Sequence, residues 1–301
     1  MESLKILKRR IRTVSSTMQL TRAMELVSAA KLRKAQTRLV SSRPYASKMQ
    51  TILENLSSAS TALTHTLFEK REIKHKGLVI LTSDRGLCGS YNVSIFRKAE
   101  EFLSSEPKEK IKLILIGKKG FYYYRKRPWE IRLKYLDFGS KVDLSRVKEI
   151  TSNLVNLFLS GEVDEIYFLY TRFISTTSYR VTLNKFLNIE RLTEKSFTAT
   201  TPDFAPRREE KLEEGYLEYI FEPSVEKLFE DLLPRYCLTR IQMALSEAFA
   251  SEQGSRMIAM GAATRNAEEM LENLTLLRNK ARQSAITKEM VEIASGVEAL
   301  K

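Results

Sequence analysis

Two series of apolar positions with the same spacing lie at opposite ends of the chain. Near the start, apolar residues recur at Leu4, Leu7, Ile11, Val14 and Met18. Near the end, apolar or small residues recur at Met260, Ala263, Ala267, Met270, Leu274, Leu277 and Ala281. Alternating steps of three and four residues are typical of a coiled-coil seam, not of the wider stripe on a helix that covers a globular core. We therefore predict an antiparallel pair of long helices, projecting as a rod from a domain built by the middle of the chain.

The two helices are predicted to be long and to contain one proline each. Runs from about residue 3 to 58 and from about 224 to 296 would each span roughly 85–110 Å at 1.5 Å per residue. Pro44 predicts a kink or short break, because the residue before a proline avoids the helical region. The spacing of three and four then resumes at Met49, Ile52, Leu56, Ala59 and Leu63. Pro234 predicts a bend in the second helix.

The middle of the chain changes to a different period. Short β-branched runs at 77–82, 111–117 and 165–173 alternate with helical patterns at about 92–104 and 143–160. This alternation predicts a parallel, doubly wound sheet, that is, a Rossmann-like α/β domain. Residues 179–189 are predicted to form a hairpin partner of 165–173, and 216–222 a further strand. The predicted division is a helix at 1–58, an α/β domain at 77–222 and a second helix at 223–301.

Positive charge is concentrated in the first helix. The chain carries a net charge of +13 over 301 residues, and its first fifty residues contain only Glu2 and Glu25 as acids. The cations among them are Lys5, Lys8, Arg9, Arg10, Arg12, Arg22, Lys31, Arg33, Lys34, Arg38, Arg43 and Lys48. Such a surface favours an acidic partner: nucleic acid, lipid headgroups or acidic protein. A basic coiled-coil protein that binds nucleic acid is therefore one hypothesis.

Enzyme motifs are weak. SDRGLCGSYN (83–92) follows the first strand, where a dinucleotide-binding protein keeps its phosphate loop, but Gly86 and Gly89 give G-x-x-G instead of G-x-G-x-x-G. A tight turn with Ser90 or Asn92 as helix N-cap is the simpler interpretation. The aromatic and basic residues of FYYYRKR (121–127) are of a kind that stacks on nucleic-acid bases. More commonly, such residues pack in the hydrophobic core and at its edge. We predict no catalytic, cofactor-binding or metal-binding residue.

Two further features concern compartment and membrane. Cys88 and Cys237 lie far apart and form no spaced pair, which favours a reducing compartment. We expect no membrane-spanning segment, because no apolar run is long enough. The heptad seam begins at Leu4, so we also expect no dispensable leader.

Several segments together resemble one family. ITKEMVEIASGVEAL (286–300), RAMELVSAAKLRKAQ (22–36), SRPY (42–45), SDRGLCG (83–89) and SEQGSRMIAMGAATRNAEEM (251–270) resemble, in order, the gamma subunit of F-type ATP synthases. The resemblance runs from Leu4 to Leu300. It implies a non-catalytic shaft inside a ring of α and β subunits, with an α/β foot that meets the epsilon subunit and the c-ring. Such a shaft couples ion-driven rotation to conformational cycling of the β catalytic sites.

The resemblance also implies site residues and a location. Contacts that transmit torque to β subunits are expected at a lower level from Arg9, Arg10, Met24, Lys31, Glu252 and Arg256, with Cys88 near the same element. An upper level is expected from Arg282, Gln283 and Thr287, and contacts to the c-ring and epsilon from Tyr219 and Glu222. Small residues in 244–267 and the tip GVEAL are expected to form a bearing. The complex is expected at the cytoplasmic face of a bacterial inner membrane, with neither nucleic acid nor a small-molecule ligand bound to this chain.

Overall fold

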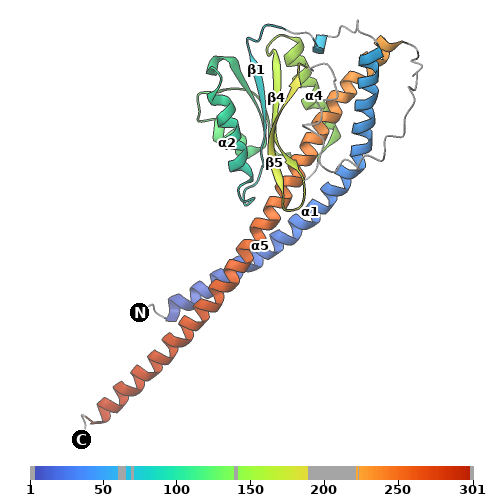
Figure 1. The fold of residues 1–301 in the computed structure, drawn as a ribbon. Coiled ribbons are helices and arrows are strands. Elements are labelled where there is room, and N and C mark those ends of the chain that lie inside the picture. Colours follow the sequence, from blue (N-terminus) through green and yellow to red (C-terminus); the bar gives the residue numbers. More distant parts are fainter. Residues whose placement is uncertain are drawn as a thin grey trace. The chain divides into compact units, whose positions relative to one another are not determined.

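The computed structural model describes residues 4–59, 66–68, 71–138, 142–188, 222 and 224–298, and its elements are drawn in Figure 1. The elements are α1 (Leu4–Ala59), η1 (Thr66–Phe68), β1 (Lys76–Leu81), α2 (Tyr91–Ser104), η2 (Lys108–Lys110), β2 (Ile111–Ile116), α3 (Lys118–Tyr124), β3 (Glu130–Tyr135), α4 (Leu144–Leu159), β4 (Glu165–Phe173), β5 (Tyr179–Leu187) and α5 (Val225–Glu298). The chain divides into a helical unit, residues 1–29 and 256–301, and a sheet unit, residues 30–255.

The sheet unit contains a five-stranded sheet in the order β3-β2-β1-β4-β5. Strands β1 to β4 are parallel, and β5 returns antiparallel to β4 as its hairpin partner. The predicted strands at 77–82, 111–117, 165–173 and 179–189 are therefore confirmed within a residue or two. Helix α3 and strand β3 were not predicted. β3 is an edge strand of sequence EIRLKY with no fully buried side chain. Its charged and apolar residues alternate as in a half-buried strand, but it lacks the continuous β-branched run by which the other strands were predicted.

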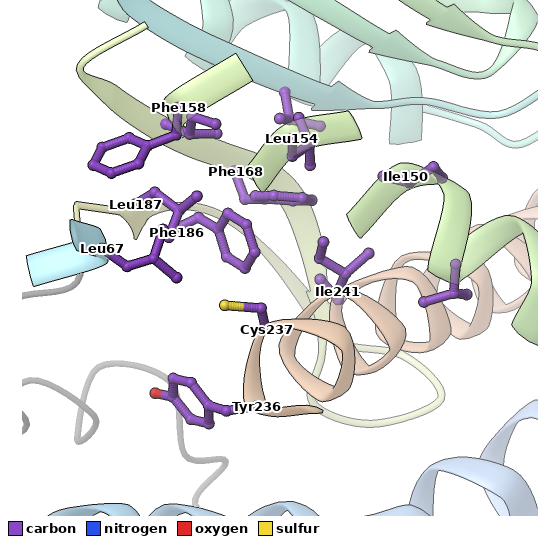
Figure 2. Close-up of a cluster of buried hydrophobic side chains, with 14 of the residues drawn as sticks. Leu67, Ile150, Leu154, Phe158, Phe168, Phe186, Leu187, Tyr236, Cys237 and Ile241 are labelled. Atoms are coloured by element: carbon purple, nitrogen blue, oxygen red, sulfur yellow. The ribbon is translucent and has the colours of Figure 1, made fainter. Parts of the chain in front are cut away.

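Alternate residues of the strands face two separate hydrophobic cores. On one face, Leu78, Ile80 and Leu113 pack against helices α2 and α3. On the other face, the sheet packs against α4, the first third of α5 and the later part of α1. Figure 2 shows part of this second core, with Phe168 and Phe186 of the sheet among Ile150 and Leu154 of α4 and Cys237 and Ile241 of α5. The sheet is thus buried on both faces, as a doubly wound fold requires.

Neither long helix is broken at its proline. α1 continues through Pro44, and α5 continues through Pro234. A short break at Pro44 is therefore excluded, whereas a kink there and a bend near Pro234 stay predictions. A proline inside a helix costs about 3 kcal/mol, but buried neighbours flank each one: Leu39 and Met49 in α1, and Leu233 and Tyr236 in α5. Packing of the surrounding turns keeps the chain helical. Among the described helices, none carries an apolar stretch long enough to cross a bilayer.

The helical unit contains an antiparallel helix pair. The hydroxyl of Thr264 donates to that of Thr21 at 2.9 Å, and a Cβ on Gly261 would lie 3.0 Å from Glu25 Oε1. Residue numbers rise along one helix as they fall along the facing helix, so the two helices run antiparallel. The predicted seam of the first helix is confirmed, since Leu7 is buried and Leu4, Ile11, Val14 and Met18 are at least half-buried.

The predicted seam of the second helix is right at five of its seven positions. Met260, Ala263, Ala267, Leu274 and Ala281 are at least half-buried, but Met270 and Leu277 are each 53% exposed. At those two places the neighbouring residues Leu271 and Arg278 face inward instead, and Thr264 is also buried. The same one-residue shift occurs in α1 of the sheet unit, where Leu53 is buried and Ile52 is 42% exposed.

Gly117 closes the turn between β2 and α3. Its φ is +98°, a value that favours glycine. Its N–H donates to the carbonyl of Tyr135 at 2.9 Å, which ties β3 to the end of β2. A Cβ here would lie 2.1 Å from the carbonyl oxygen of Thr82. Backbone therefore approaches backbone too closely for any side chain.

Replacing this glycine tests the turn. We expect Gly117→Ala to lower the free energy of unfolding by about 3 kcal/mol or more, because backbone strain and the clash with Thr82 add. Gly161→Ala is the control, since Gly161 also has a positive φ but nothing lies within 4 Å of its Cβ position. It should lose only about 1–2 kcal/mol. Urea unfolding of the full chain measures both, and equal losses would contradict this account.

Candidate functional site

Helix α5 covers the edge of the sheet where doubly wound domains bind ligands. Such ligands lie outside the carboxyl ends of the strands, at the point where the strand order reverses. Here the order reverses at β1, which has β2 on one side and β4 on the other. Leu245, Ala248 and Phe249 of α5 lie against the carboxyl ends of β1 and β2, where they leave a cavity of about 40 Å³, and the hydroxyl of Ser251 reaches the carbonyl of Thr171 on β4. Small-molecule sites usually enclose about 300–1,000 Å³, so the helix occupies the crevice.

Small residues of α5 hold it to the sheet by directional bonds. The hydroxyl of Ser251 donates to the carbonyl of Thr171 at 3.1 Å, and that of Ser255 donates to the carbonyl of Cys88 at 2.7 Å. The hydroxyl of Tyr91 donates to the carbonyl of Ala248 at 3.2 Å. Positions 248, 251 and 255 follow one another by about one helical turn, so they share a face. These α5 residues belong to a buried, anchored interface. The predicted bearing role of 244–267 is therefore wrong for this part of the segment.

The loop after β1 is tied internally instead of forming a phosphate nest. Asp84 Oδ1 accepts hydrogen bonds from the N–H of Lys118, at the start of α3, and from that of Asp137. Ser83 Oγ donates to the carbonyl of Arg85 at 2.7 Å. A carboxylate thus takes the place that an anionic ligand would need at α3. Ser90 holds the N-cap position of α2 but makes no side-chain cap bond.

Within this loop, Cys88 and Leu87 have opposite environments. Cys88 is 2% exposed, and its sulfur contacts Ser83 and Asn92. Leu87 is 61% exposed and adopts a positive φ of 60°. The loop therefore presents Leu87, not Cys88, to its surroundings. The sequence signal for this was indirect: a leucine between two glycines in a turn.

A carboxylate lies buried in the sheet unit. Glu247 of α5 is 4% exposed, and burial raises its pKa to about 7 despite the positive charges of Arg172 on β4 and Arg43 on α1. Its Oε2 and the Nε of Arg43 are buried without a hydrogen-bond partner. Holding a charge in such surroundings is unfavourable unless it is paired. No sequence motif pointed to Glu247, because one acid within a helix is normally a surface residue.

The residues expected at the lower level differ in exposure. In the helical unit, Arg9 and Arg10 are exposed, Met24 is half-buried and Arg256 is 7% exposed. In the sheet unit, Lys31 and Glu252 are half-buried. Most of the other α1 cations also point outward, including Arg33, Lys34 and Arg38. The basic face predicted from the sequence therefore exists as a surface.

The residues expected at the upper level lie on an exposed stretch of α5. Arg282, Gln283 and Thr287 are all exposed, and the hydroxyl of Thr287 donates to the carbonyl of Gln283 at 3.0 Å. Apolar side chains of the same stretch are also exposed: Ile286 49%, Met290 66%, Val291 58% and Ile293 63%. Side chains of this composition, exposed together on one helix, are typical of a segment that contacts another protein.

The remaining predicted contacts fall partly outside the described residues. Glu222 is exposed, whereas Tyr219 and the strand predicted at 216–222 lie outside the described part apart from Glu222 itself. The tip GVEAL is likewise described only for its backbone up to residue 298. Within the described residues, no group of three or more His, Cys, Asp or Glu side chains lies close enough to hold a metal ion.

The aromatic side chains of segment 121–127 pack in the hydrophobic core and at its edge. Tyr124 is fully buried, and Tyr123 stacks on Phe96 with ring centroids 4.0 Å apart. The guanidinium of Arg127 lies 3.8 Å from the ring centroid of Tyr123. One of these rings is therefore in the core and the other is covered by a cation. The hypothesis that this segment offers stacking surfaces to bases gains no support.

Comparisons with known proteins agree with one another. Residues 3–300 match the family model described as ATP synthase. Over its full length the chain is 41% identical to the ATP synthase gamma chain of Protochlamydia amoebophila and 43% identical to that of Moorella thermoacetica, covering 100% of each. These relatives give the nucleic-acid hypothesis no support.

Solved structures give the same result for the fold. A chain of the Euglena gracilis mitochondrial ATP synthase superposes with a TM-score of 0.66 at 17% identity, covering 99% of this chain and 94% of that one. A chain from the central stalk and c-ring of the Tetrahymena thermophila mitochondrial ATP synthase gives a TM-score of 0.58 at 25% identity, covering 81% of this chain and 99% of that one. Sequence and fold together show that the chain belongs to the ATP synthase family, among its gamma chains.

Proposed function

We propose that this chain is the central-stalk rotor of an F-type ATP synthase, coupling ion-driven rotation of a c-ring to conformational cycling of the β catalytic sites. One observation carries the proposal: α5 is a single helix that is anchored to the sheet at residues 245–255 and exposes its side chains at residues 282–295. Helix α5 thus belongs both to the α/β domain and to an exposed helical end. Full-length similarity to gamma chains supports the same role.

The proposed role is mechanical and not catalytic. Helix α5 lies at the crevice that would take a nucleotide, which supports assigning ATP chemistry to other subunits. A single helix pair has different side chains on each side. It therefore offers each of three similar β subunits a different contact energy at a given angle, and rotation shifts each one between conformations in turn.

The lower contact is assigned to the basic α1 surface and to the loop after β1. Arg9, Arg10, Met24 and Lys31 on α1, with Glu252 on α5, would face an acidic element of a β subunit. Arg256, predicted from the sequence to act with them, is 7% exposed and offers little surface to such a contact. Exposed cations attract such a surface over about 10 Å at moderate salt. The exposed Leu87 would supply an apolar contact from the loop that contains Cys88.

The upper contact is assigned to Arg282, Gln283 and Thr287. The guanidinium of Arg282 is able to hold a carboxylate through two parallel hydrogen bonds, which fixes an angle as well as contributing energy. The exposed apolar residues of 286–293 would lie inside the ring formed by the α and β subunits.

The foot is assigned to the α/β domain, proposed as residues 77–222 between helices 1–58 and 223–301. Its contacts with the epsilon subunit and the c-ring would include Tyr219 and Glu222. These contacts would attach the complex to the cytoplasmic face of a bacterial inner membrane.

Co-purification at moderate salt tests the assignment. A tagged full-length chain should retain two larger subunits with ATPase activity. Salt-sensitive binding of DNA or RNA as the main activity, without such subunits, would instead support the nucleic-acid hypothesis. Micromolar binding of ATP or NAD to the chain alone would argue for an enzyme.

A cation at Met24 tests the lower contact. We expect Met24→Lys to leave assembly intact but to lower the number of ions pumped per ATP. The added positive charge would bind the acidic residues of the β subunit too tightly and oppose their release from α1. Met24→Leu, which keeps the volume, should behave like the original chain. The measurement is ATP-driven ion pumping in vesicles alongside ATPase activity. Normal coupling in the lysine variant would remove Met24 from the contact.

Alanine substitution of Arg282 and Gln283 tests the upper contact. The double variant Arg282→Ala with Gln283→Ala should make the rotor less stable at its preferred stopping angle. We expect the free energy of that state to rise by about 1.5–3 kcal/mol per charged hydrogen bond lost. Most of the torque should survive, because steric pushing does not depend on one ion pair. Lys288→Ala, which removes only a pair with Glu292 on the same helix, is the control. Single-molecule dwell angles and lifetimes report the effect, and values equal to those of the control would exclude this contact.

Substitution at Tyr219 and Glu222 tests the foot. We expect Tyr219→Ala with Glu222→Ala to release the c-ring while ring ATPase activity persists. Glu226→Ala, an exposed acid at the start of α5, serves as the control and should keep the c-ring bound. Pull-down of the c-ring and ATPase assays separate the outcomes, since parallel loss of both would indicate unfolding.

A further inference from the structure

Leu87, in the loop after β1, has a backbone conformation that leucine rarely adopts. Its φ is 60°, and that of Gly89 is 55°. The left-handed region is unfavourable for a residue with a Cβ, so a leucine stays there only where its surroundings hold it. The side chain of Leu87 is largely exposed, so its own burial does not supply this hold. The conformation depends instead on bonds to the neighbouring backbone.

The carbonyl of Cys88, which follows Leu87 directly, is fixed from two directions. The N–H of Tyr91, at the start of α2, donates to its oxygen at 3.2 Å. The hydroxyl of Ser255 on α5 donates to the same oxygen at 2.7 Å, the usual length of a good hydroxyl hydrogen bond. A carbonyl oxygen has two lone pairs, so both are used. The shorter of the two bonds therefore ties the loop to α5.

Two more hydroxyls extend this connection to β5 and α2. The hydroxyl of Tyr179, the first residue of β5, lies 3.2 Å from that of Ser255 and 3.3 Å from that of Ser90. Each hydroxyl has a single hydrogen to donate, and that of Ser255 goes to the carbonyl of Cys88. Tyr179 therefore donates to Ser255, and Ser90 donates to Tyr179. Ser90, which makes no cap bond to α2, is thus bonded to β5 instead.

The turn between β4 and β5 lies against the same part of α5. A Cβ on Gly254 would be 3.3 Å from the carbonyl oxygen of Thr176, which is closer than ordinary van der Waals contact. The absence of a side chain at Gly254 therefore lets the two backbones approach. Adjacent residues of α5 thus support two loops, the β4–β5 turn at Gly254 and the loop after β1 at Ser255. All of these residues belong to the sheet unit.

We propose that Ser255 is a positioning residue, whose bond to the carbonyl of Cys88 holds the loop in the conformation that presents Leu87 to a β subunit. The proposal rests on the rotor function and deepens its lower contact. A loop that is not held would yield when a partner presses on it, since exposed loops open at little cost in free energy. Tied to α5, the loop passes the force on Leu87 directly to that helix. Ser255 is buried, so it acts through the loop.

Amide hydrogen exchange of the full-length chain tests the attachment of the loop. Ser255→Ala removes one bond to the Cys88 carbonyl and leaves that from Tyr91. Exchange in residues 83–91 should become about five- to tenfold faster, as expected for one lost hydrogen bond, while exchange in β2 stays unchanged. Ser246→Ala is the matched control, because the hydroxyl of Ser246 bonds to the carbonyl of Gln242 within α5. Exchange in residues 83–91 equal to the control's, or an equal increase in β2, would overturn the proposal.

A double-mutant cycle in the assembled complex tests what the attachment is for. Leu87→Ala removes the apolar contact, and Ser255→Ala loosens the loop that presents it. Each should lower the number of ions pumped per ATP. The variant with both changes should pump no fewer ions than Leu87→Ala alone, because Ser255 acts only through Leu87. Additive losses would mean that Ser255 acts by another route, and would contradict the proposal.

Tyr179→Phe decides the question if Ser255→Ala does not fold. It removes only a hydroxyl from a half-buried ring. Exchange in residues 83–91 should again rise, by about twofold, because its bonds are the longer ones. Exchange equal to the control's would then overturn the proposal. The proposed function fails separately: if Leu87→Ala pumps as many ions per ATP as the original chain, the β contact of this loop is wrong, whereas the exchange rates still decide its attachment to α5.

Discussion

The contact between α5 and the carboxyl edge of the sheet determines how the rest of this molecule works. A doubly wound sheet leaves a crevice at the reversal of its strand order, and in this chain a helix of the same polypeptide lies there. The helix approaches closely because its facing residues are small: Ala244, Ala248, Ser251 and Ser255 are all buried. The two serines also turn their hydroxyls to backbone carbonyls of the sheet unit. A fold suited to ligand binding thereby becomes a support for a helix.

The same contact explains the division of chemistry along α5. Where the helix meets the sheet its residues are buried on nearly every side, and from Arg282 to Ser295 they are exposed on every side. Buried serines and alanines suit permanent attachment. Exposed Arg, Gln and apolar residues suit contacts that form and break as a shaft turns.

Much of the fold could be predicted from the sequence because periodicity records burial directly. The antiparallel helix pair, four strands and both large helices of the α/β domain followed from spacing alone. The seam of the second helix was misplaced at Met270 and Leu277, where Leu271 and Arg278 face inward instead. Strand β3 was missed because its charged and apolar residues alternate and form no continuous β-branched run like those of the predicted strands.

The candidate site was less predictable, because it depends on contacts between distant segments. The small residues of 244–267 suggested a bearing, but those up to Ser255 pack within the sheet unit. Nothing in the local sequence distinguishes a small residue that slides from one that is anchored. Cys88 stood out in its motif, yet the exposed residue of that loop is Leu87. Glu247 could not be recognised from the sequence, because its burial depends on packing against distant segments and an acid within a helix is normally a surface residue.

The central claim is that α5 stays fixed on the sheet while the chain rotates. The hydroxyls of Tyr179 and Ser255 lie 3.2 Å apart across this contact, so Tyr179→Cys with Ser255→Cys provides a pair for a short thiol cross-linker, while Cys88 and Cys237 are buried. The measurement is the rate of ATP-driven rotation in the assembled complex before and after cross-linking. The account predicts an unchanged rate, because the contact never opens. Arrest of rotation by the cross-link, reversed when the link is cleaved, would contradict it.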